Sequence, residues 1–164
     1  MKFGRAFRHL VTPHWLALRA YPPASLKEIE QAIKASERQH AGEMRFAVEA
    51  GLPLHFLKFG PRRRAEALFS ELRVWDTAHN NGVLLYVQLV DRAIEIVADR
   101  GIAARVEQAE WNVICRAMEE RFRQGQFREG ALEGIAQATR VLARHFPPHG
   151  RPANELPDKP AVLP

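Results

Sequence analysis

The sequence contains little cysteine, no long apolar run and no acidic residue among its first 20 positions. With Cys115 as the only cysteine in 164 residues, neither an internal disulfide nor a zinc site built from several cysteines can form. The longest apolar run, Val83 to Val87, is far shorter than the roughly 20 residues of a membrane-spanning helix. The start also lacks the apolar segment and cleavage site of a signal peptide, so we expect a cytoplasmic protein that does not span a membrane.

Several enzyme signatures are missing as well. The sequence has no G-x-x-x-x-G-K-[ST] phosphate loop and no G-x-G-x-x-G, H-E-x-x-H or G-x-S-x-G motif. No nucleophile stands out, because Cys115 lies among apolar positions typical of a core. Any hydrolysis would therefore depend on water activated by a metal ion.

The composition indicates one folded domain, since 46% of the residues are hydrophobic and 26% are charged. The net charge of +5 suits a basic solvated surface, and it also permits attraction to anionic lipid, nucleic acid or phosphorylated ligands. Nucleic acid is the least favoured of these partners, because neither a known binding module nor an aromatic-basic stacking pattern accompanies the charge.

Composition divides the chain into a basic leader (residues 1–20), a core domain (21–147) and a proline-rich tail (148–164), which we expect to be disordered because prolines interrupt regular structure. In the leader, Phe3, Phe7, Leu10 and Val11 recur at helical spacing among arginines. This basic amphipathic pattern predicts either docking on an anionic membrane surface or a membrane-associated protein, or packing on the chain's own domain.

Periodicity predicts the elements of the core. Apolar residues at helical spacing predict helices, and alternating or continuous apolar residues predict strands. In chain order we expect a helix from Ser25 to about His40, a strand over Glu43–Ala50, a helix over Pro61–Trp75, strands over Gly82–Val90 and Ala93–Asp99, and helices over Glu107–Gly125 and Phe127–Phe146.

These elements predict an α/β fold, a three-layer α/β/α sandwich around a small mixed β-sheet. The first two strands should be parallel because a helix connects them, and the third should be antiparallel because only Asp91 and Arg92 separate it from the second. The strand over Gly82–Val90 is apolar nearly throughout, so it needs helices on both faces.

That topology brings scattered polar residues to one edge of the sheet. Oxygen-bearing side chains suit a hard cation, calcium or magnesium, which could orient a phosphorylated substrate and a water molecule. Alternatively, Asn80-Asn81-Gly82 is only a strand-entry turn. The expected metal ligands are Glu37, Glu43, Asp76, Asn81 and Asp99, and the other residues expected at this edge are His40, His79 and Asn80.

Three segments, "SERQHAGEMRFAVE", "LRVWDTAHNNGVLLYVQLVDRAIEIVADRGI" and "EGIAQATRVLARHFP", resemble the TPM-domain family, the thylakoid-lumen-phosphatase-like proteins. The resemblance implies the α/β/α sandwich. It also implies an acid phosphatase or a binder of calcium and other divalent ions, or a role in assembly or repair of membrane complexes. The family's acidic site would use the ligands named above, whereas Asp91 falls at the opposite edge as a turn residue.

From the sequence we therefore expect a divalent-cation site with metal-dependent phosphatase activity. The alternative is a non-catalytic adaptor that acts at the cytoplasmic membrane face through the basic leader.

Overall fold

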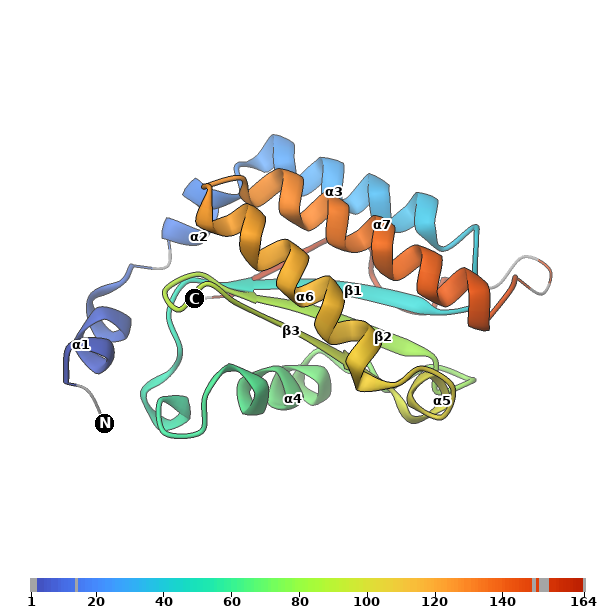
Figure 1. The fold of residues 1–164 in the computed structure, drawn as a ribbon, viewed down its shortest axis with the longest axis horizontal. Helices are drawn as coiled ribbons and strands as arrows, with labels where there is room; N and C mark the ends of the chain where they lie inside the picture. Colours follow the sequence, from blue (N-terminus) through green and yellow to red (C-terminus); the bar gives the residue numbers. More distant parts are fainter. Residues whose placement is uncertain (1–2, 14, 149, 151–153, 164) are drawn as a thin grey trace.

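The computed structural model describes residues 3–13, 15–148, 150 and 154–163, and Figure 1 shows its ribbon. The strands are β1 (Glu43–Glu49), β2 (Gly82–Gln88), β3 (Ala93–Ala98) and β4 (Ala161–Leu163). The helices are α1 (Phe3–Val11), α2 (Trp15–Ala20), α3 (Pro23–Ser36), the 3-10 helix η1 (Leu54–Phe56), α4 (Pro61–Glu71), α5 (Arg100–Ala103), α6 (Gln108–Arg123) and α7 (Phe127–His145). Residues 1, 2, 14, 149, 151–153 and 164 of the predicted leader and tail lie outside the described residues.

The four strands form one mixed sheet in the order β3-β2-β1-β4. β1 and β2 are parallel, with Glu43 opposite Gly82 at the start of the pair. β3 returns antiparallel beside β2 after a tight turn in which Arg92 has a positive φ of 54°. The parallel pair and the hairpin are those that the sequence predicts.

Helices cover both faces of this sheet, with α3, α6 and α7 on one face and α4 on the other (Figure 1). Alternate strand residues divide between two cores. Beneath the three helices lie Met44, Phe46, Val48, Val83, Leu85 and Val87, and beneath α4 lie Ala47, Leu84, Tyr86 and Val97. The predicted three-layer α/β/α sandwich is thereby confirmed.

Two helices end four residues before the predicted bounds. α3 begins at Pro23, before the predicted Ser25, because proline suits the first turn, where a backbone N–H has no partner to lose. It ends at Ser36, and α4 ends at Glu71. The residues that follow each helix form turns leading to the strand-entry edge of the sheet.

α6 buries Trp111, Cys115, Met118 and Phe122, apolar residues that recur along it at helical spacing. Burial raises the pKa of the Cys115 thiol to about 12, so the thiol stays protonated at neutral pH. The structure therefore places this cysteine in the core, as expected from its apolar neighbours.

α4 is tied to the sheet by a buried polar network. The Nη2 atom of Arg64 lies 2.8 Å from Oε1 of Glu49, and the hydroxyl of Tyr86 donates to Oε2 of Glu49 at 2.6 Å. Arg64 also donates to Glu71 at 3.0 Å. Glu49 is 1% exposed, so its charge is compensated almost entirely by these donors.

The leader packs on its own domain, at the β2–β3 hairpin. Arg5 lies 2.6 Å from Oδ2 of Asp91, and Nε2 of His9 lies 3.2 Å from the other carboxylate oxygen. Nδ1 of His9 also accepts the N–H of Leu52 at 2.9 Å. Neither leader helix nor any other helix in the described ranges is long and apolar enough to cross a membrane.

The expectation of a disordered tail is wrong for residues 154–163, which we call the C-terminal strap. Within it, β4 pairs parallel with β1, Ala161 opposite Ala47 and Leu163 opposite Glu49. Arg45 donates to the carbonyls of Pro157 and Lys159. Proline disfavours helices and central strands because it has no backbone N–H to donate. Here the prolines lie outside the paired residues of an edge strand, so no hydrogen bond between strands is lost.

Candidate functional site

Three strand ends meet at the sheet edge beside α5 (Figure 1). Glu43 begins β1 opposite Gly82, the first residue of β2. Asp99 follows β3 and donates its backbone N–H to the Gly82 carbonyl at 2.8 Å, while the Asn81 carbonyl accepts the N–H of Glu43 at 3.0 Å. The strand pairing thus brings Glu43, Asn81 and Asp99 to one edge, and cation binding by them stays a prediction.

A close backbone approach separates the two carboxylates of this row. A Cβ at Gly82 would lie only 2.0 Å from the carbonyl oxygen of Val74, so the chain at Val74 passes directly over Gly82. Residues in one row of a sheet point to the same face, and Val74 therefore lies between Glu43 and Asp99. In the described ranges no three His, Cys, Asp or Glu side chains converge as a ready metal site.

A cavity of about 650 Å³, which we call the rim cavity, opens at this edge. Three of the predicted residues lie in its wall, namely Glu43, His79 and Asn81. The rest of the wall comes from Ala41, Ala78, Gly101, Arg105, Phe146, Pro147 and Glu155. The cavity therefore combines the strand-entry edge with the end of α7 and with the strap.

Asn81 is 7% exposed and carries a buried oxygen without a donor. Its side-chain Nδ2 donates to the carbonyl of Ala41, and its backbone N–H donates to Oγ1 of Thr77 at 3.1 Å. These bonds orient the amide, but Oδ1 accepts no hydrogen bond from any described residue. A buried acceptor of this kind costs roughly 1–3 kcal/mol unless a ligand or water satisfies it.

Asp99 has a similar unmatched oxygen. It caps α5, and its Oδ1 accepts the backbone N–H of Arg100 at 2.7 Å. Its Oδ2 is buried and accepts no hydrogen bond within the described part of the chain. Asn81 precedes Gly82 and Asp99 is hydrogen-bonded to the Gly82 carbonyl, so both donor-less oxygens belong to the strand-entry edge, but only Asn81 lies in the wall of the rim cavity.

Glu43 links the site to the strap. It is 3% exposed, and its Oε2 accepts the backbone N–H groups of Glu155 at 3.2 Å and Leu156 at 3.1 Å. Burial raises the pKa of the Glu43 carboxyl, and the nearby carboxylates of Glu155 and Asp158 raise it further against those two hydrogen bonds. Glu155 in turn accepts the N–H of Ala78 at 2.9 Å.

One carboxylate oxygen of Glu37 is already hydrogen-bonded within the domain. Its Oε1 accepts the N–H of Met44 at 3.0 Å. Burial raises the pKa of Glu37 to about 8, and Glu43 and a hydrogen bond with Asp158 add to the rise. At neutral pH this carboxyl is therefore largely protonated, a state that favours a hydrogen-bonded pair of acids.

His40 serves the core. Its Nε2 lies 2.7 Å from the hydroxyl of Ser36, which is 2.6 Å from the hydroxyl of Thr139 on α7. Its Nδ1 accepts the N–H of Gly42 at 3.1 Å. Burial lowers the pKa of the ring to about 4, so His40 is neutral and both nitrogens are engaged.

The remaining predicted residues lie toward the surface. Asp76 is exposed and forms a 2.6 Å ion pair with Arg73. Asn80 adopts a positive φ of 52°, and its Oδ1 accepts from Nε of Arg100 at 3.0 Å. This conformation belongs to the strand-entry turn that was the alternative interpretation of the stretch.

Sequence analysis missed the contributions of the strap and of Arg105. Glu155 and Asp158 occur in a segment that proline content marked as irregular, so they were not considered. Arg105 lies 5.3 Å from the centroid of the Phe146 ring, at the cavity wall. The pattern that could have pointed to the strap is the short apolar run Ala161–Leu163 after the acids.

Comparison with known proteins finds a matching family model and similar solved structures. The family model of the TPM domain, labelled TPM phosphatase, matches residues 22–141. The solution structure of BA42 from the psychrophilic bacterium Bizionia argentinensis is 31% identical, with a TM-score of 0.74, and the match covers 84% of this chain and 92% of that one. The N-terminal domain of a P. gingivalis protein shares the fold at 18% identity and a TM-score of 0.63, over 87% and 97% of the two chains. No curated protein matched.

Proposed function

This chain belongs to the TPM domain family, and we propose that its rim cavity binds a divalent cation, calcium or magnesium. The observation that carries the proposal is the buried oxygen Asn81 Oδ1 in the cavity wall, which accepts no hydrogen bond from the described residues, with Asp99 Oδ2 as a second such oxygen at the same sheet edge. Both ions take oxygen ligands from carboxylates, amides, backbone carbonyls and water.

The residues of the rim cavity fit a cation site of low affinity better than one of high affinity. Asn81 Oδ1 would hold the ion together with backbone carbonyls and water, and Glu43 and Glu155 on the cavity wall would add negative charge. Because few carboxylates are free to coordinate, we expect a calcium Kd on the order of 10⁻⁴ to 10⁻³ M.

Phosphate-ester hydrolysis is the reaction that we propose for this site. A bound divalent cation neutralises phosphoryl charge and lowers the pKa of water. Arg105 lines the same cavity, and a guanidinium group suits the oxygens of a phosphate. The label of the family model supports this assignment.

Calorimetric titration with calcium and with magnesium tests the cation site. We expect wild type to bind, and Glu155→Gln to lower the affinity at least about ten-fold because it removes a charge from the cavity wall while keeping the shape. Asp76→Asn is the matched control and should bind as wild type, since Asp76 is paired with Arg73 outside the cavity wall. Absence of binding to wild type at millimolar cation, or equal loss in both variants, would overturn the proposal.

Two further readouts separate binding from hydrolysis. Because the pKa of Glu43 is raised, protons compete with the cation, and binding should be stronger at pH 8 than at pH 5. Phosphate release from an aryl phosphate should require added magnesium or calcium and should be lost in Glu155→Gln. Cation binding without phosphate release would retain the site and reject the phosphatase assignment.

We also propose the cytoplasmic location that the sequence predicts. Its support is the use of one buried, protonated cysteine, which suits a reducing compartment. Fractionation of the producing cells, with a periplasmic marker alongside, tests it.

A further inference from the structure

Helix α1 packs on the domain with its polar face. Arg5 and His9, one turn apart, make the contacts with Asp91 and Leu52. His9 is 4% exposed, and Arg5 also donates to the carbonyl of Leu57 at 2.9 Å. An amphipathic helix normally buries its apolar face, so the orientation of α1 is inverted.

The apolar stripe of α1 consequently faces the solvent. Phe7, Leu10 and Val11 are 63%, 64% and 54% exposed, and they lie at helical spacing on one side. Trp15 and Leu18 of α2, the next helix of the leader, are also exposed, at 51% and 44%. Leaving such side chains in water forgoes roughly 1.5–3 kcal/mol for each one that could be buried.

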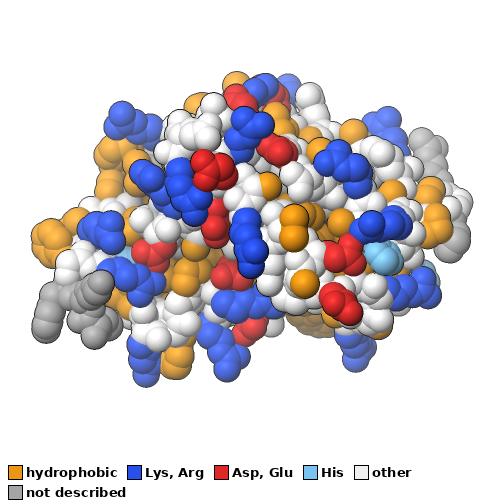
Figure 2. Space-filling model, viewed as in Figure 1, with side chains coloured by type: hydrophobic (Ala, Val, Ile, Leu, Met, Phe, Trp, Pro, Cys, Tyr) orange, Lys and Arg blue, Asp and Glu red, His pale blue; other side chains and the backbone are white. Residues whose placement is uncertain are grey.

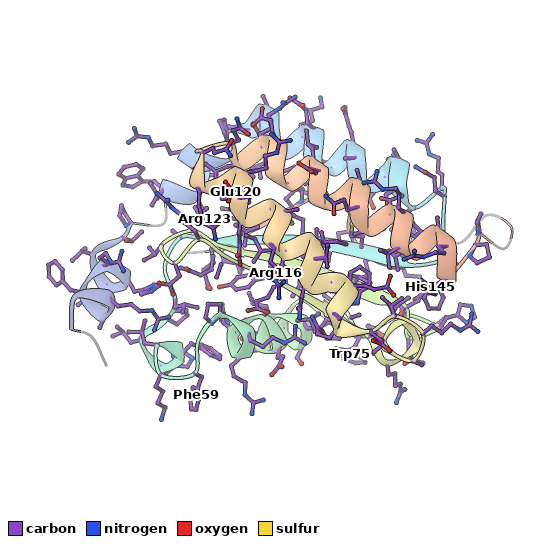
Figure 3. All side chains as sticks on the ribbon, viewed as in Figure 1. Phe59, Trp75, Arg116, Glu120, Arg123 and His145 are labelled. Carbon is purple, nitrogen blue, oxygen red and sulfur yellow. The ribbon has the colours of Figure 1, made fainter. Side chains whose placement is uncertain are left out.

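Nearby, the segment around η1 adds to this surface. Leu54 and Phe59 are 59% and 56% exposed, and Figure 3 shows Phe59 pointing away from the ribbon below α1. Together these residues are seven of the nine large hydrophobic side chains found exposed in the described part of the chain. Such clustering at one end marks an interaction surface rather than scattered exposure.

We propose that this leader surface docks on an anionic membrane. It comprises Phe7, Leu10, Val11, Trp15, Leu18, Leu54 and Phe59 with the exposed basic residues Arg8, Arg19 and Lys58. Figure 2 shows hydrophobic side chains interleaved with Lys and Arg at this end. Aromatic and aliphatic side chains bordered by cations are what an interfacial helix presents to lipid headgroups.

Charge favours an anionic lipid surface over a second copy of the chain. Neither residues 1–27 nor residues 51–60 contain an Asp or Glu. Two such surfaces facing each other would bring like charges together, whereas an anionic bilayer attracts every one of these cations. Because α1 has only nine residues, the contact is shallow and depends on several anchors at once.

The orientation leaves the rim cavity free. Asp91, where the leader docks, lies in the hairpin after β2, and Glu43 lies at the start of the parallel strand β1. The leader surface and the rim cavity are therefore at opposite ends of the sheet (Figure 1). The proposal does not depend on cation binding, so either can fail alone.

Sedimentation with vesicles tests the leader surface. We expect the full chain to bind vesicles of equal phosphatidylcholine and phosphatidylglycerol, to bind phosphatidylcholine alone far less, and to lose binding at 0.5 M salt. Phe7→Glu with Leu10→Glu should lower the partition coefficient at least about ten-fold. Arg8→Gln with Arg19→Gln should lower it about five-fold per charge on the anionic vesicles alone.

Val113→Glu is the matched control, since Val113 on α6 is 61% exposed and lines a groove formed by α6 and α7 alone, with no described leader residue in it. It should bind vesicles as wild type does, and thermal unfolding should show all variants folded. Equal loss in Val113→Glu, or no binding by wild type, would overturn the proposal. A wild-type dimer that Phe7→Glu with Leu10→Glu dissociates would assign the surface to a second copy instead.

Discussion

Glu43, the first residue of β1, accepts a 3.1 Å hydrogen bond at Oε2 from the backbone N–H of Leu156, 113 residues further along the chain. The same oxygen accepts the N–H of Glu155. One buried carboxylate therefore fixes the strap at the point where the strap enters the rim cavity. The family match ends at residue 141, so the strap that Glu43 holds lies outside the matched segment.

Replacing Glu43 by Gln should loosen the strap. A neutral amide oxygen accepts two N–H groups less strongly than a carboxylate, so we expect unfolding free energy to fall by about 1–2 kcal/mol. Backbone amides of residues 155 and 156 should exchange faster with deuterium. Glu120→Gln, at an exposed position of α6, is the control, and unchanged exchange in Glu43→Gln would contradict the role of this contact.

Stability should depend on pH through Glu37. Burial raises its folded-state pKa from the usual 4.5 to about 8, so the folded chain retains a proton that the unfolded chain releases. The resulting stabilisation is full below about pH 4.5 and is lost as the pH rises through about 8. Glu37→Gln keeps a neutral side chain at every pH, so its stability relative to wild type should increase between pH 5 and pH 9.

Urea unfolding of wild type and Glu37→Gln at pH 5, 7 and 9 measures this difference. We expect a change on the order of 1 kcal/mol across the range, since a partly exposed group is screened by water. A stability difference that is constant with pH would show that Glu37 ionises as it does in the unfolded chain.

Removing one partner from the buried network beneath α4 should lower the free energy of unfolding. Glu49→Gln leaves the buried guanidinium of Arg64 with Glu71 as its remaining acid, and we expect a loss of about 3 kcal/mol. Tyr86→Phe removes one hydrogen bond and should cost about 1 kcal/mol or more. Both are measured by urea unfolding.

Arg63→Gln supplies the comparison, because Arg63 is exposed and pairs only with Glu66 of its own helix. Its effect should stay below about 0.5 kcal/mol. Equal effects at Glu49 and Arg63 would mean that burial adds nothing to the network.

The sheet and its layers could be predicted because the signals are periodic. Met44, Phe46 and Val48 alternate, and the continuous apolar run of β2 requires cover on both faces. With a crossover helix and a two-residue turn, topology then places Glu43, Gly82 and Asp99 in one row. None of this needs information about contacts between individual side chains.

The roles of the site residues could not be predicted in the same way, because they depend on contacts between distant segments. Nothing in the sequence around His40 shows that Ser36 and Gly42 occupy both ring nitrogens. Likewise, strand topology alone would make the carboxylates of Glu43 and Asp99 neighbours, but the chain at Val74 passes over Gly82 and separates them. The strap was missed because a three-residue edge strand has too little periodicity to detect.

β4 pairs with β1 only at Ala47, Val48 and Glu49, and this pairing joins segments more than 100 positions apart in the chain. During synthesis, β1, β2 and β3 can associate well before β4 emerges from the ribosome. Throughout that interval the outer backbone edge of β1 is open to the strands of other nascent chains. Arrival of β4 ends this exposure, so a slow or truncated C-terminal segment should appear first as lower soluble yield.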